Sequence, residues 1–342
     1  MLQRIRESRK RACSLRIVAI TPDRKHDGIA SCVIEGLLEK GVEIIASDPG
    51  NGIEKGHTDR EILDHAKSAD YIFSFWGKVR GNNPPRHYLL DQISRKEVSV
   101  YIDGSEWTCT GYNDDQEKVY APWSKKSINR QVYDAKFNPQ RLQGSPWINF
   151  GMLQRCNWYF KRECYRDDLE LGIVPLPFSG KKEYIIEENT SRDIDVFCSF
   201  GQNMTGLRSE VEDYCRQIVT KNVKVLESPV SKKEYENYIS RSKIVVSAWG
   251  GGQHCFREWE SLGARACAFV QRHTVEFPDK PVDGYHWVEY GNMQEFDQKM
   301  KFYLNNPEDC VRIAENGFNF LSSKHMPANR VEYILNIIQG EL

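Results

Sequence analysis

Residues 243–271, KIVVSAWGGGQHCFREWESLGARACAFVQ, decide the fold of this chain. The stretch contains two short apolar runs, Ile244–Ala248 and Ala266–Val270, which are rich in small and β-branched residues. Between them lie three consecutive glycines and then apolar residues at three-residue spacing, beginning at Phe256. The apolar runs are typical of buried strands and the spacing is typical of a helix. The stretch therefore predicts a βαβ unit with a glycine-rich first turn.

The glycine turn, Gly250, Gly251 and Gly252, is suited to a phosphorylated ligand. Glycine lets the backbone approach a ligand closely, and the following helix points its free N–H groups at the same place. Arg257 and Glu260 are three residues apart in this helix, so both can face the ligand. An arginine suits phosphate oxygens, and a carboxylate accepts from the two hydroxyls of a ribose. The alternative is an ion pair between these two residues on a solvated face.

Four segments carry a wider resemblance: WYFKRECY (158–165), LGIVPLPF (171–178), DIDVFCSFGQNMTGLRSEVEDYC (193–215) and FREWESLGARACAFV (256–270). Together they resemble GT-B glycosyltransferases, in particular the exostosin-like and spore-coat-type "glycosyltransferase family 1" groups. The resemblance implies an α/β protein with two Rossmann-like domains facing a central cleft, and a C-terminal helix that crosses back to the first domain. Many retaining members have an acidic residue eight positions before the helix glutamate, where this chain has Gly252. The choice between inverting and retaining chemistry therefore stays open.

The resemblance also implies roles for individual residues. A nucleotide-sugar donor would bind the second domain through Arg208, Gly250, Gly251, Gly252, His254, Phe256 and Glu260. Its ribose would lie at Glu260 and its base near Phe269–His273. Arg208 and Arg257 would stabilise the charge of the departing diphosphate. The alternatives are a surface ion pair of Arg208 with Glu212, four residues away, and a merely solvated His254.

An inverting mechanism also needs a catalytic base from the first domain, near the acceptor hydroxyl. Asp27 and Asp103 are the two main candidates because each follows a predicted strand. Glu106 and His26 are the next candidates. A retaining mechanism needs no such base. No Asp-x-Asp or clustered metal-ligand set follows a predicted strand, so we expect no metal and no cofactor besides a UDP- or GDP-linked sugar. A magnesium-assisted variant stays open.

The first half alternates strands and helices, which predicts a parallel sheet with crossovers. The predicted strands are 15–20, 42–46, 71–75 and 98–102, and the predicted helices are 29–40, 59–68 and 86–94. Residues 107–157 are polar with scattered aromatic residues and have no clear period, which indicates a long irregular insertion.

The second half repeats the alternation. Its predicted strands are 195–199, 223–226, 244–248, 266–270 and 287–288, and its predicted helices are 207–219, 232–240, 256–265, 293–305, 307–321 and 328–340. The expected parts are a basic tail (1–14), an acceptor domain (15–178), a charged hinge (179–192), a donor domain (193–327) and the C-terminal helix (328–342).

Composition excludes several other classes of protein. The chain of 342 residues has a net charge of −1, which argues against a protein that coats nucleic acid. It has no apolar run long enough to span a membrane and no apolar core of a secretion signal, so we expect a cytoplasmic protein. Its ten cysteines never form a C-x-x-C pair, which indicates free thiols.

The partners expected are thus a nucleotide sugar and an acceptor that the sequence does not identify: a glycan, a protein, a lipid-linked sugar, a small molecule or a modified nucleic acid. Two other functions are compatible with the same pattern. A nucleotide-sugar 2-epimerase would release a changed sugar without an acceptor. A non-catalytic binding protein would hold the nucleotide sugar without turning it over.

Overall fold

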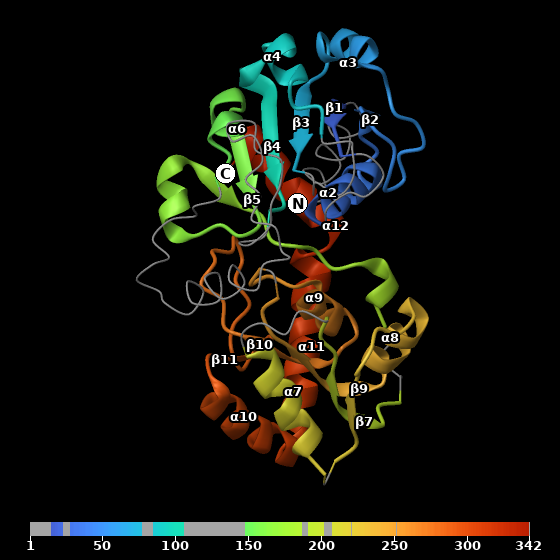
Figure 1. Ribbon diagram of the computed structural model, residues 1–342, viewed down its shortest axis with the longest axis vertical. Coiled ribbons are helices and arrows are strands. Elements are labelled where there is room, and N and C mark those ends of the chain that lie inside the picture. Colours follow the sequence, from blue (N-terminus) through green and yellow to red (C-terminus); the bar gives the residue numbers. More distant parts are fainter. Residues whose placement is uncertain are drawn as a thin grey trace. The chain divides into compact units, whose positions relative to one another are not determined.

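The computed structural model describes residues 15–22, 28–76, 85–105, 148–186, 191–201, 207–219, 221–250 and 252–341. They form two compact units (Figure 1). The described residues up to Pro177 belong to the first unit, together with Val275–Pro278 and the chain from Pro327 onward. The second unit consists of Phe178–Thr274 and Asp279–Met326.

The first unit contains a six-stranded parallel sheet with the strand order β2-β1-β3-β4-β5-β6. The strands are β1 (Arg16–Ile20), β2 (Glu43–Ala46), β3 (Tyr71–Phe75), β4 (Ser99–Asp103), β5 (Trp158–Lys161) and β6 (Ile173–Pro175). The helices are α2 (Gly28–Glu39), α3 (Asp59–Ala66), α4 (Leu89–Ile93) and α6 (Phe150–Arg155), with short 3₁₀ helices η1 (Lys96–Val98) and η3 (Arg166–Leu171). Strands 1 to 4 and the first helices match the predicted alternation.

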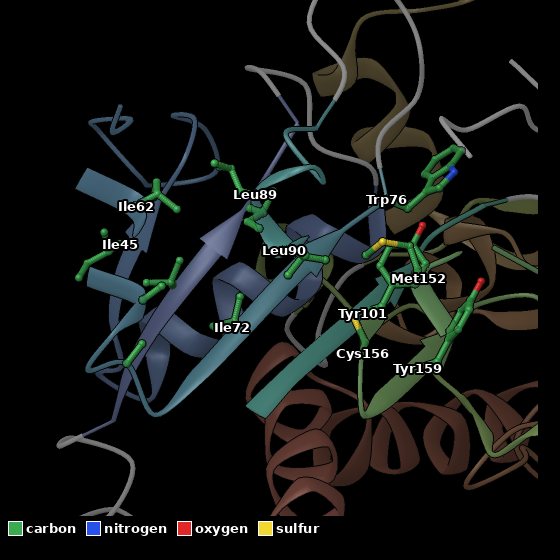
Figure 2. Close-up of a cluster of buried hydrophobic side chains, with 14 of the residues drawn as sticks. Ile45, Ile62, Ile72, Trp76, Leu89, Leu90, Tyr101, Met152, Cys156 and Tyr159 are labelled. Carbon is green, nitrogen blue, oxygen red and sulfur yellow. The ribbon is translucent and has the colours of Figure 1, made fainter. Parts of the chain in front are cut away.

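Helices cover both faces of this sheet, as a buried parallel sheet requires. On one face, Ile62 of α3, Leu90 of α4 and Met152 of α6 belong to one cluster of buried side chains that also contains Tyr101 and Tyr159 of the sheet (Figure 2). The α6 helix lies inside the stretch in which the sequence predicted no regular structure. Asn149 caps it by accepting from Met152 N at 3.1 Å.

The last helix, α12 (Pro327–Ile338), packs on the other face of the first sheet, against α2. Gly36 of α2 allows this close approach, because a Cβ there would lie 2.2 Å from the carbonyl oxygen of Pro327. The Tyr333 ring meets the Phe160 ring edge-on, with centroids 6.5 Å apart. The C-terminal helix therefore returns to the first unit, as the resemblance implied.

The second unit contains a five-stranded parallel sheet with the order β11-β10-β9-β7-β8. Its strands are β7 (Ile194–Cys198), β8 (Val223–Val225), β9 (Ser242–Ser247), β10 (Cys267–Gln271) and β11 (Val288–Tyr290). Its helices are α7 (Arg208–Gln217), α8 (Lys232–Ser240), α9 (Phe256–Gly263), α10 (Met293–Asn305) and α11 (Pro307–Lys324), with the 3₁₀ helix η4 (Lys182–Tyr184). Each predicted strand and helix of this half is present, with its ends shifted by a few residues at most.

The segment predicted as a hinge belongs in its described part to the second unit. Tyr184 of η4 is 6% exposed and packs with Phe197 and Ile239 in an apolar cluster. Ile186 N donates to Gly263 O at 3.1 Å. These contacts attach the segment to the core of the second unit, so its chain does not behave as a free linker.

Candidate functional site

The order of the strands indicates a candidate position for a ligand in the second unit. The chain builds the sheet outward from β7, first to β8 on one side and then to β9 on the other, so the direction reverses between β7 and β9. In open parallel sheets, ligands bind outside the carboxyl ends of the strands at such a reversal. Phe200 follows the end of β7, and Gly250 follows the end of β9.

Arg208 lies at this point, at the first residue of α7. The side chain is 8% exposed, and its Nε and Nη2 donate to Ala248 O at 3.3 and 3.2 Å. Its guanidinium lies 5.4 Å from the centroid of the Phe200 ring. Burial lowers the pKa of Arg208, which stays a cation because its ordinary value is so high. Glu212, the partner of Arg208 in the alternative interpretation, pairs with Arg216.

Gly250 lies directly against Arg208, so a side chain at this position would displace the guanidinium. A Cβ at Gly250 would lie 2.5 Å from Arg208 Nη2, far closer than such atoms approach in proteins. The glycine turn thus makes room for a guanidinium, a use that the sequence alone did not indicate. Gly250 N donates to Gly252 O at 2.9 Å. Gly251 lies outside the described residues.

Arg257 approaches Phe200 as well. Its guanidinium lies 5.4 Å from the centroid of the Phe200 ring, and the Arg208 guanidinium lies at the same distance. The two cations therefore share one aromatic ring. No ion pair joins Arg257 to Glu260 among the described residues, and its buried Nε has no hydrogen-bond partner there. The alternative, an ion pair of Arg257 with Glu260 on a solvated face, is not formed by direct contact, although the charge of Arg257 acts to lower the pKa of Glu260. The half-buried guanidinium keeps its donors for another acceptor.

Glu260 lies one turn further along α9 and is half-buried. Its Oε2 accepts from the Tyr235 hydroxyl of α8 at 2.9 Å. Burial raises the pKa of Glu260, and the charge of Arg257 and the hydrogen bond from Tyr235 offset this only in part. The Tyr184 hydroxyl also interacts with this carboxylate, and burial together with the charge of Glu260 raises the pKa of Tyr184. The carboxylate is thus oriented by a residue that no local sequence pattern connects to it.

His254 lies in the interior of the unit. It is 3% exposed, and its ring centroid lies 5.5 Å from those of Phe178 and His273. His273 Nε2 in turn lies 3.1 Å from Oε1 of the buried Glu258. The solvated alternative for His254 is therefore wrong, whereas its role in donor binding stays a prediction.

Phe256, the first residue of α9, stacks on Phe178 with ring centroids 3.9 Å apart and an interplanar angle of 19°. The region expected near the base begins in β10, where Phe269 is fully buried. Trp249 N donates to Gln271 Oε1 at 3.0 Å across the ends of β9 and β10. Polar backbone and side-chain groups of this region are therefore committed to holding the strand ends together.

Asp103 lies elsewhere, in the first unit at the end of β4. It is 1% exposed, pairs with Lys161 Nζ at 3.0 Å, and accepts from the Tyr159 hydroxyl and from Ser105 N at 2.8 Å. Burial favours the protonated acid, but Lys161 and these donors outweigh it and lower the pKa of Asp103. A base needs access to its substrate and a free lone pair, so these contacts favour a structural role. Asp27, His26 and Glu106 lie outside the described residues.

The part of the chain that the structure describes forms neither a cluster of metal ligands nor a membrane-spanning helix. There, no three His, Cys, Asp or Glu side chains come together as metal ligands. Within the same residues, no helix has the length and apolarity to cross a bilayer.

The structure brings the predicted residues Arg208, Gly250 and Arg257 together near Phe200. Phe200 itself was not predicted as a site residue.

Comparison with known proteins agrees with this architecture. Residues 184–336 match the family model described as "Glycosyl transferase-like". No curated protein matches the sequence. A glycosyltransferase from Rickettsia africae ESF-5 is similar in structure over 95% of this chain and 98% of its own, with a TM-score of 0.56 and 9% identity. The Anabaena protein HepE in complex with UDP and glucose is similar over 95% of this chain and 100% of its own, with a TM-score of 0.51 and 11% identity.

At these identities the likeness concerns the fold. Both units have the parallel sheet and flanking helices of a Rossmann-like domain, and the match to the family model covers the unit in which the two arginines meet. The chain has the GT-B fold, and its residues 184–336 are similar in sequence to glycosyl transferase-like proteins.

Proposed function

We propose that this protein is a glycosyltransferase that moves a sugar from a nucleotide-sugar donor to an acceptor hydroxyl. The observation that carries the proposal is the pair of guanidiniums, Arg208 and Arg257, on the Phe200 ring at the strand-order reversal. It lies within the segment that matches the glycosyl transferase-like family. HepE, which shares the fold, is described in complex with UDP and glucose, and UDP is therefore the first nucleotide to test.

The proposed chemistry follows from the charges of the site. When the bond between the sugar and the diphosphate breaks, the electron pair stays on the leaving phosphate oxygen while the acceptor oxygen bonds to the sugar. The acceptor hydroxyl gives up its proton to a base in an inverting reaction, or to the leaving phosphate oxygen in a retaining one. Cations and helix N–H groups that are already in place stabilise this charge without reorganisation. Arg208 and Arg257 supply the cations, the start of α9 supplies the positive end of its dipole, and the Glu260 carboxylate accepts from the ribose hydroxyls.

We expect UDP to raise the melting temperature of the protein, because a ligand that binds only the folded state stabilises it by mass action. Glu260→Ala should weaken UDP binding by about 1–3 kcal/mol, the cost of losing a charged hydrogen-bond partner. Isothermal titration with UDP, GDP and a panel of UDP-sugars measures both effects and identifies the preferred nucleotide.

Two controls accompany this experiment. Glu227→Ala removes an exposed carboxylate from the same unit and should leave the UDP affinity unchanged. Tyr235→Phe keeps Glu260 but removes its 2.9 Å hydrogen bond, so it should weaken binding less than Glu260→Ala does. Equal UDP affinity in Glu260→Ala and in the wild type would show that Glu260 is not part of the UDP site.

We propose in addition that the reaction is independent of metal, since the arginines and the helix end meet the leaving group. Release of UDP from the preferred UDP-sugar, in the presence of its acceptor, should therefore continue in EDTA. Complete loss in EDTA that manganese restores would contradict this. The products also separate the alternatives: a changed free sugar without an acceptor identifies an epimerase, and binding without any product identifies a binding protein.

A further inference from the structure

Lys181 places a positive charge beside the start of α9, in addition to Arg257 within that helix. It directly precedes η4, in the segment predicted as a hinge, and its Nζ lies 4.2 Å from the centroid of the Phe256 ring. Phe256 is the first residue of α9. The ammonium therefore lies over the aromatic side chain with which the helix of Arg257 and Glu260 begins.

The chain around Lys181 is firmly attached to the second unit. Phe178, three residues before Lys181, stacks on the same Phe256 ring that the lysine contacts. Gly180 N donates to His325 O at 2.8 Å, and a Cβ at Gly180 would lie 2.8 Å from Leu321 Cδ1 and 3.0 Å from Met326 Sδ. Lys181 is thus held at α9 by tightly packed neighbours on its N-terminal side.

No ion pair joins Lys181 to another of the residues that the structure describes. The nearby carboxylates have other partners, since Glu183 pairs with Lys232 at 3.0 Å and Glu260 accepts from Tyr235 at 2.9 Å. The face of an aromatic ring attracts an ammonium but leaves the N–H donors that point away from the ring available. Lys181 is half-buried, so these donors can still reach a ligand.

We propose that Lys181 binds a phosphate oxygen of the nucleotide-sugar donor, as the third cation of the site. This inference rests on the proposed function and extends it to a residue outside the expected donor domain. A lysine ammonium suits a phosphate because it is a compact charge that can turn its donors toward any of the oxygens. The Phe256 ring supports the side chain and limits the conformations that binding must restrict.

The test compares UDP with uridine, which shares the base and the ribose but lacks both phosphates. Lys181→Ala should weaken UDP binding on the order of tenfold, the loss expected for one hydrogen bond to a charged group. Uridine binding, followed by ligand-observed NMR, should be unchanged. Lys181→Arg should keep most of the UDP affinity, whereas Lys181→Gln should lose it. Lys301→Ala, which removes an exposed cation from α10 of the same unit, should have no effect.

A double-mutant cycle tests the contact with the ring. In a Phe256→Leu background the further loss caused by Lys181→Ala should shrink, because residues that act together are not additive. Equal losses for UDP and uridine would overturn the proposal, since Lys181 would then act through the fold of the site. So would an unchanged UDP affinity in Lys181→Ala. Failure of the wild-type protein to bind UDP or any other nucleoside diphosphate would overturn the proposed function, and this inference with it.

Discussion

Arg257→Ala is expected to lower the turnover of the protein about 10²–10³-fold, the usual loss for one donor that stabilises developing charge. The guanidinium is half-buried beside Phe200, and no carboxylate among the described residues pairs with it. Negative charge on the diphosphate grows as the sugar leaves, so the arginine interacts more strongly with the transition state than with the bound donor. Turnover, measured as UDP release at saturating donor, should therefore fall much more than UDP affinity.

Three further variants test whether the loss of turnover comes from the missing guanidinium charge. Arg257→Lys should recover only part of the turnover, because an ammonium cannot reproduce the planar fork. Arg312→Ala, which removes an exposed arginine paired with Asp309 on α11, should turn over normally. Arg208→Ala should resemble Arg257→Ala. Near-normal turnover with only a lower melting temperature would make Arg257 a structural residue.

Lys161→Met is expected to lower the free energy of unfolding by about 3–5 kcal/mol, the cost of leaving one partner of a buried ion pair alone. Lys161 and Asp103 are each 1% exposed, and 3.0 Å separates Nζ from Oδ2. Lys161 Nζ also donates to Ser105 Oγ at 2.9 Å, so the change removes two contacts at the end of the sheet. Urea unfolding of the variant and the wild type measures the loss.

The dependence on pH has a definite sign. In the wild type, folding lowers the pKa of Asp103, so the pair stabilises the protein above about pH 4, near the unfolded value, and this contribution fades as pH falls through the folded pKa. Without Lys161, burial is the main influence and disfavours the carboxylate. The difference in stability between Lys161→Met and the wild type should therefore narrow as the pH is lowered from 7 toward 4.

Two further variants decide the role of Asp103. Lys161→Met combined with Asp103→Leu should regain much of the lost stability, because an apolar pair replaces the charges. Lys67→Met, which breaks an exposed pair with Asp64, should change stability little. If Asp103→Asn kept wild-type stability but abolished turnover, the catalytic-base prediction would be upheld and the structural role would be wrong.

The elements of the second unit were predictable because their signals are local. Helix α8 (Lys232–Ser240) is capped by Ser231 and Glu234, and strand β9 is a short apolar run followed by glycines. The short helix α6 was not predicted. It has only six residues and therefore almost no period, and its helical start depends on the single cap Asn149.

The sequence by itself determined the alternation of strands and helices, the glycine turn and the placement of Arg257 and Glu260 on one helix. These features depend on residues within about one or two turns of each other. Only the tertiary structure decided that Arg208 and Arg257 share the Phe200 ring. It also decided that Tyr235 donates a hydrogen bond to Glu260 and that Lys161 forms an ion pair with Asp103.

The physical reason is the distance along the chain that each contact spans. Tyr235 and Glu260 are 25 residues apart, and Asp103 and Lys161 are 58 apart. No periodicity connects residues at such separations. Asp103 and Lys161 meet because the register of the parallel strands β4 and β5 places them opposite each other. Tyr235 and Glu260 meet because their helices, α8 and α9, both pack on β9.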